Sequence, residues 1–186
     1  MRSAPTEAES YATTSTRIIG GISIVIGLIC LIDIAIEWRT RGGLIAAAVI
    51  VCVMILAYLI LVRPQVTLSP ERLSIRNHIR DHKVPWSDVE GVDMADILRI
   101  QIPGGRLRCT GVQMMMRDLR RERAGRIKPD RESSISRADF VVGRVQHHME
   151  YYGKTSTGEI ISRWATPELI ALAVFALIAA LTYLLG

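Results

Sequence analysis

Two long apolar runs open the hydrophobic pattern of the chain. Ile18–Ile36 is apolar apart from Ser23 and Asp33, and Gly43–Val62 contains 20 residues without a charge. A helix of about 20 apolar residues crosses about 30 Å of hydrocarbon. Because the connection between the runs is short, the two helices must be antiparallel neighbours. We therefore expect a transmembrane helical hairpin over residues 18–62.

A third apolar run lies at the C-terminus. Thr166–Glu168 has the composition of a helix start, and the following Leu169–Leu185 contains 17 residues without a charge. This length is at the short end for a membrane span, and Arg163 and Trp164 are suitable interfacial anchors. The run predicts a third transmembrane helix over 165–186. A helix on the membrane surface or in a partner's groove is the alternative.

Between the second and third runs, short stretches alternate apolar and polar residues. Two such stretches flank the turn Ser69–Arg72, and two more flank Pro103–Gly105. A spacing of two is the period of β-strands, and proline and glycine favour turns. With a further strand at about Ile79–Val84, we expect at least five short strands in a small curved antiparallel sheet or open barrel. The alternating apolar positions are Val66, Leu68, Leu73, Ile75, Leu98, Ile100, Ile102, Leu107 and Cys109.

A helical period follows these strands. It predicts a helix over Arg137–Tyr152, with Ser136 and Asp139 as a capping box, and a shorter helix near Met116–Arg123. Met1–Thr16 is rich in Ser, Thr, Ala and Glu without periodicity, which favours a disordered tail. The apolar stripe of the longer helix comprises Phe140, Val141, Val145, His148 and Tyr152.

The stretch Arg63–Val92, RPQVTLSPERLSIRNHIRDHKVPWSDVEGV, carries a family resemblance. It resembles the opening of the bacterial pleckstrin-homology-like (PH-like) domains of small actinobacterial membrane proteins. The resemblance covers Arg63–Thr110, and its most specific element is Val84–Val89. It implies a two-helix membrane hairpin before the domain and a closing helix laid across the sheet. The domain-core signature that it singles out is Pro85, Trp86, Ser87 and Asp88.

Together these patterns predict an α+β membrane protein. Its parts are a transmembrane helical hairpin, a small PH-like β-barrel or sheet with a C-terminal helix, and a third transmembrane helix. The expected boundaries are a tail at 1–17, the hairpin at 18–62, the PH-like domain at 63–153 with a basic insertion at 113–135, a linker at 154–164 and the last helix at 165–186.

The charge distribution favours one orientation. Residues 63–164 hold 19 Lys and Arg against 13 Asp and Glu, so they supply all of the net charge of +5. Arg17 and Arg63 flank the hairpin on the side of this domain, whereas the link between the helices has Arg39 and Arg41. The positive-inside rule therefore places the PH-like domain in the cytoplasm of a multi-pass plasma-membrane protein.

One segment of the domain is strongly basic. The segment Arg117–Arg131 contains seven basic residues and only three acidic ones, Asp118, Glu122 and Asp130. Contact with anionic lipid is one interpretation, since each basic residue near a membrane surface contributes about 1 kcal/mol. A solvated loop and a dock for an acidic protein surface are the others, and nucleic acid is not expected because no aromatic residues interleave the arginines. The basic residues are Arg117, Arg120, Arg121, Arg123, Arg126, Lys128 and Arg131.

Catalytic and metal-binding patterns are not found in the sequence. His78 and His82 fall in a strand-and-turn region, and His147 and His148 are adjacent, so neither pair forms a metal site on one helix face. Three cysteines without metal or disulfide spacing are expected to be free thiols. We expect no enzyme activity, no cofactor and no small-molecule substrate.

The apolar helices carry two features of interest. Asp33 is an ionisable residue inside an apolar run, which indicates an interfacial carboxylate near the helix end or, alternatively, a proton-relay or partner-helix role. Small residues four apart would let helices approach closely. These are Ser23 and Gly27, Gly43 and Ala47, and Ala176 and Ala180.

The predicted function is accordingly that of a non-enzymatic membrane protein. Its PH-like domain would dock other proteins as an accessory or scaffold subunit of a larger membrane complex, for example a respiratory or cell-envelope assembly. The alternative is an anionic-lipid sensor that reads the inner leaflet through the segment Arg117–Arg131.

Overall fold

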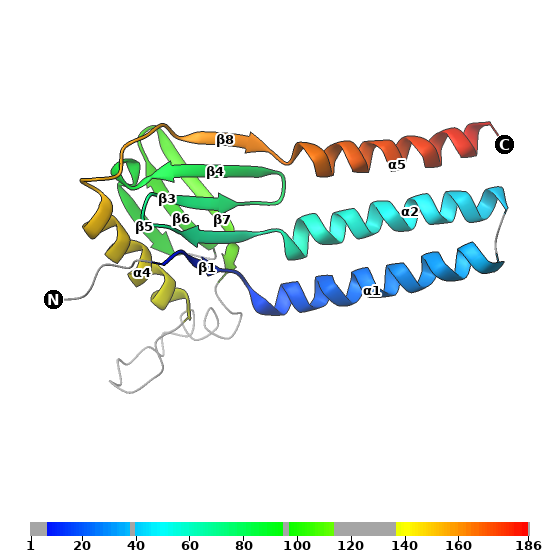
Figure 1. Ribbon diagram of the computed structural model, residues 1–186, viewed down its shortest axis with the longest axis horizontal. Coiled ribbons are helices and arrows are strands. Elements are labelled where there is room, and N and C mark those ends of the chain that lie inside the picture. The colour runs from blue at the N-terminus through cyan, green and yellow to red at the C-terminus, as the bar shows by residue number, and fades with distance from the viewer. Residues whose placement is uncertain (1–6, 38–39, 95–96, 114–136, 186) are drawn as a thin grey trace, which may run out of the picture. The chain divides into compact units, whose positions relative to one another are not determined.

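The computed structural model describes residues 7–37, 40–94, 97–113 and 137–185. The chain forms two compact units. One unit contains three apolar helices, and the other contains two β-sheets and a helix (Figure 1). The predicted α+β organisation is therefore confirmed.

In the helical unit, α1 spans Thr14–Glu37, α2 spans Arg41–Ala57 and α5 spans Thr166–Leu184. A π-helical turn, η1 at Tyr58–Val62, extends α2. Helix α2 packs against both α1 and α5 (Figure 1). All three helices, with η1 counted as part of α2, are long and apolar enough to cross a membrane.

Glycines set the approach of α1 to α2 and η1. A Cβ atom on Gly27 would lie 2.6 Å from the Met54 side chain, and one on Gly20 would lie 2.7 Å from Val62. The two contacts are seven residues apart, so they recur on one face of the helix. Gly20 therefore provides the second close contact of α1, which the sequence analysis had assigned to Ser23. The Ser23 hydroxyl instead donates to the Ile19 carbonyl of its own helix, at 2.9 Å.

The second unit contains a five-stranded and a three-stranded antiparallel sheet. Strand order is β1-β2-β3-β4-β8 in the first and β5-β6-β7 in the second. The two β-hairpins that the sequence predicts around the turns Ser69–Arg72 and Pro103–Gly105 are both present. The strands are β1 Glu9–Tyr11, β2 Gln65–Leu68, β3 Arg72–Arg76, β4 Arg80–Pro85, β5 Gly91–Met94, β6 Ile97–Ile102, β7 Gly105–Gln113 and β8 Ile161–Trp164.

The domain core lies between these sheets and α4, which spans Arg137–Tyr152 as the sequence predicts. Strand alternation points Val66, Leu68, Leu73 and Ile75 inward, and each is fully buried. Helix α4 adds its own buried stripe, and Phe140 at its start is half exposed. The buried helix residues are Val141, Val145 and His148.

A glycine allows β7 to pack closely on β2. A Cβ atom on Gly111 would lie 2.6 Å from the backbone of Gln65. The Gly111 carbonyl also accepts the backbone N–H of Thr13 at 3.0 Å. This point of close packing therefore joins the two sheets and the segment that follows β1.

Two predictions about irregular segments are wrong. Residues 9–11 of the expected tail form the edge strand β1, and α1 begins at Thr14. Residues 161–164 of the expected linker form β8. Tertiary contacts order the first of these strands, because Tyr11 packs against the core and Glu9 pairs with Arg144 of α4. Such long-range contacts leave no local periodicity.

Candidate functional site

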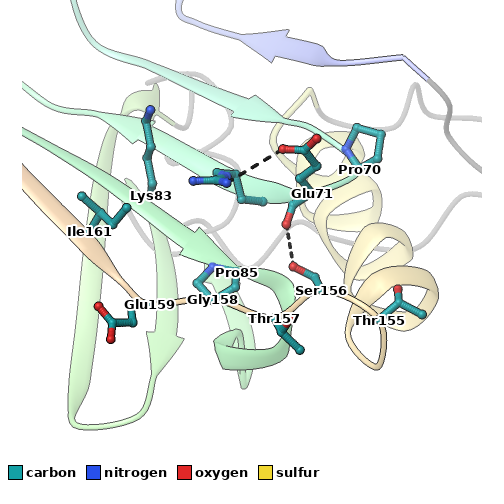
Figure 2. A pocket seen from close by; sticks show the side chains of 11 residues that line it. Pro70, Glu71, Lys83, Pro85, Thr155, Ser156, Thr157, Gly158, Glu159 and Ile161 are labelled. Atoms are coloured by element: carbon teal, nitrogen blue, oxygen red, sulfur yellow. Dashed lines mark hydrogen bonds and ion pairs between the residues drawn. The ribbon is translucent and has the colours of Figure 1, made fainter.

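A cavity of about 520 Å³ opens at the edge of the five-stranded sheet. The β2–β3 turn, the end of β4 and the segment that follows α4 surround it (Figure 2). Its lining residues are Pro70, Glu71, Arg72, Lys83, Pro85, Thr155, Ser156, Thr157, Gly158, Glu159 and Ile161.

Trp86 holds the walls of this cavity in place. It begins the 3₁₀ turn η2, Trp86–Asp88, directly after β4. Its indole Nε1–H donates to the Ser69 carbonyl at 2.8 Å, and its backbone N–H donates to Ser156 Oγ at 3.1 Å. Ser156 Oγ in turn donates to the Glu71 carbonyl, at 2.5 Å (Figure 2). One buried tryptophan thus links the β2–β3 turn to the segment after α4.

The cavity lining combines apolar residues with polar residues and charges of both signs. Arg72 and Lys83 contribute positive charge, and Glu71 and Glu159 contribute negative charge. The Arg72–Glu71 pair is exposed and 3.9 Å apart, so it is a weak ion pair that a ligand can replace. Together with the threonine hydroxyls, these residues give the cavity hydrogen-bond donors and acceptors beside the apolar Pro70, Pro85 and Ile161.

A buried histidine supports the cavity from inside the domain. His148 of α4 is fully buried, and its ring lies 5.3 Å from that of Trp86. Its Nδ1 lies 2.9 Å from the Arg144 carbonyl, while Nε2 is buried without a hydrogen-bond partner among the described residues. Burial lowers the pKa of His148 from its usual 6.5. The ring is therefore held neutral against Trp86.

Cys109 is buried in the domain core. Burial raises the pKa of Cys109 to about 12, so that thiol stays protonated and unreactive. Within the described ranges, no cluster of three or more His, Cys, Asp or Glu residues could hold a metal ion. The cavity itself offers hydrogen-bonding groups and charges of both signs.

The residues that the sequence analysis singled out lie in different parts of the structure. Pro85 is buried and lines the cavity, and Trp86 is buried in the domain core, whereas the Ser87 hydroxyl donates to Asp88 at the surface. Asp33 is exposed on α1, within the last turns of that helix. The seven basic residues of the segment Arg117–Arg131 lie outside the described residues.

The helix-packing residues also differ in their surroundings. Gly27 and Gly43 are buried, whereas Ser23 and Ala47 are only half-buried. On α5, the half-buried positions include Leu172 and Phe175, while Ala176 and Ala180 are exposed.

Sequence reasoning missed the cavity itself. Thr155–Gly158 has the composition of a linker, and nothing local indicates that Ser156 will be buried against Trp86. The available signal was Trp86, because a buried indole N–H needs an acceptor from elsewhere in the chain.

The comparison with protein families agrees with the sequence motif. Residues 63–131 match the model of the bacterial PH domain family. The match supports a bacterial PH-like domain in this part of the chain. No curated protein and no solved structure matches the chain. The molecule therefore combines a PH-like domain with three helices that are apolar enough to span a membrane.

Proposed function

We propose that this chain is a non-enzymatic, multi-pass membrane protein whose PH-like domain docks a partner protein in the cytoplasm. The observation that carries the proposal is the open, charged cavity of that domain, in a chain that also holds three apolar helices. The role is that of an accessory or scaffold subunit of a larger membrane complex, such as a respiratory or cell-envelope assembly.

The position of the cavity supports docking of an extended segment. Glu159 and Ile161, which line it, lie just before and at the start of β8. β8 is an edge strand of its sheet, and an edge strand can pair with an incoming strand. A partner segment paired with the free edge of β8 would lie beside Glu159 and Ile161, which line the cavity.

The outer face of α5 supports assembly with other membrane proteins. Ala176 and Ala180 are exposed on this helix. Small residues let helix backbones approach closely in a membrane, where van der Waals packing and interhelical hydrogen bonds drive association. This face is therefore suited to a helix of the partner complex.

Purification of the tagged full-length chain from its native membranes in mild detergent tests the proposal. We expect mass spectrometry to find a membrane protein in stoichiometric amount. The double substitution Arg72→Glu and Lys83→Glu should remove most of it by replacing both positive charges of the cavity with negative ones. Arg106→Glu with Arg108→Glu makes the same charge change on exposed residues of β7 and should retain the partner.

The same experiment addresses the second candidate function. The segment Arg117–Arg131 carries seven basic and three acidic residues and falls within the family match. Such a segment is attracted to anionic lipid. A protein that purifies alone with bound anionic lipid would favour the lipid sensor and contradict the scaffold.

A further inference from the structure

The tip of the β3–β4 hairpin belongs to the helical unit and is tied to the ends of two apolar helices. The Ile79 carbonyl accepts the backbone N–H of Ala165, directly before α5, at 2.9 Å. Nδ1 of His78 lies 3.3 Å from the Leu59 carbonyl in η1, the C-terminal extension of α2. These contacts place the tip beside the C-terminal end of α2 and the N-terminal end of α5.

An arginine and a tryptophan stack at this place. The guanidinium carbon of Arg80 lies 3.9 Å from the ring centroid of Trp164, and both side chains are exposed. A cation–π contact uses one face of the guanidinium and leaves its in-plane N–H donors available. Among the described residues, no carboxylate forms an ion pair with Arg80. In contrast, Arg63 at the end of α2 pairs with Glu168 of α5 at 3.2 Å.

The residues around the stack have the composition of a membrane interface. Ile79 is 46% exposed at the hairpin tip, and Trp164 is 52% exposed two residues before α5 begins. Tryptophan is enriched where hydrocarbon meets headgroups, and arginine binds phosphate through its planar fork of donors. An exposed isoleucine beside them would enter the acyl region when α5 crosses the membrane.

We propose that Ile79, Arg80 and Trp164 form a binding site for the phosphate headgroup of an anionic phospholipid. The Arg80 guanidinium, oriented by the Trp164 ring, donates to the phosphate, and Ile79 contacts the acyl chains. The proposal rests on the membrane topology proposed above, but it does not require the partner protein or the basic segment Arg117–Arg131.

The chain supplies a close control for the stacked arginine. Arg163 is adjacent to Trp164 on β8 and is exposed, and strand alternation directs it to the opposite face. Arg80→Gln and Arg163→Gln therefore remove the same charge at neighbouring positions. Only the first removes the cation that stacks on the indole.

Native mass spectrometry of the full-length protein in neutral detergent tests the site. The probes are phosphatidylglycerol and phosphatidylcholine with the same acyl chains. We expect wild type to retain phosphatidylglycerol in preference. Arg80→Gln should lower its binding constant about fivefold, the equivalent of the contribution of one basic residue near a membrane surface. Trp164→Leu should lower it too, while Arg163→Gln should have less effect.

Equal losses in Arg80→Gln and Arg163→Gln would overturn the site in favour of general surface charge. Absence of any preference for phosphatidylglycerol would overturn it as well. Incorporation of each variant into phosphatidylcholine nanodiscs is the second measurement. A protein that enters them without binding phosphatidylglycerol contradicts the headgroup site alone, whereas one that does not enter them contradicts the membrane topology.

Discussion

Replacing Trp86 with alanine is expected to destabilise the PH-like domain by about 3–5 kcal/mol, the usual cost of truncating a fully buried large aromatic side chain. Trp86 is fully buried in the domain core. The substitution also leaves the Ser69 carbonyl without the indole donor and removes the ring that packs on His148. Hydrogen exchange of β2–β4 peptides in the full-length protein measures this loss as faster amide exchange.

Two further variants make the Trp86 prediction specific. Trp164→Ala makes the same truncation at a half-exposed tryptophan, so it should leave exchange in β2–β4 close to wild type. Trp86→Phe keeps an aromatic ring but loses the N–H donor, and it should fall between wild type and Trp86→Ala. Equal exchange in Trp86→Ala and Trp164→Ala would show that Trp86 does not hold the domain together.

The stability of the PH-like domain is expected to fall below pH about 6.5 because of His148. Burial lowers the pKa of this histidine in the folded state, so the unfolded chain takes up a proton at a higher pH than the folded one. Its contribution is therefore complete above the unfolded pKa and is lost as the pH falls toward the folded pKa. Arg144 and His147 add to this effect through their charges, whereas the Arg144 carbonyl opposes it.

Thermal unfolding of the full-length protein in detergent, followed by circular dichroism at pH 5 and pH 8, measures the effect. His148→Phe should reduce the difference between the two midpoints, because phenylalanine cannot titrate and can still pack on Trp86. His147→Phe, on the same helix at a half-buried position, should retain the difference. If His148→Phe and His147→Phe depend on pH alike, His148 is not the group responsible.

The strands and α4 were predictable because burial imposes a period on the sequence. Val66, Leu68, Leu73 and Ile75 alternate along two strands and all face one core, and α4 has the predicted bounds. The three apolar helices were equally clear from their length and lack of charge. In the strands and in α4, the residues that set the local period are also the ones that form the buried core.

The edges of the fold and the candidate site were not predictable in the same way. Strand β1 is three residues long, and Glu9 is paired with Arg144, which lies far away in sequence. Ser156 lines the cavity because Trp86 and Glu71 supply its partners. The stack of Arg80 on Trp164 likewise depends on two strands that are distant in the chain. Such contacts form only when distant parts of the chain meet in the folded structure. They therefore produce no regular spacing in the local sequence.

Cysteine labelling in intact cells tests the proposed topology most directly. In a background without Cys30, Cys52 and Cys109, single cysteines replace Thr40, before α2, and Thr155, at the cavity. A membrane-impermeant maleimide should label Thr40→Cys in intact cells and Thr155→Cys only after the cells are opened. Labelling of Thr155→Cys in intact cells, or release of the protein from membranes by alkaline carbonate, would contradict a membrane protein with a cytoplasmic PH-like domain.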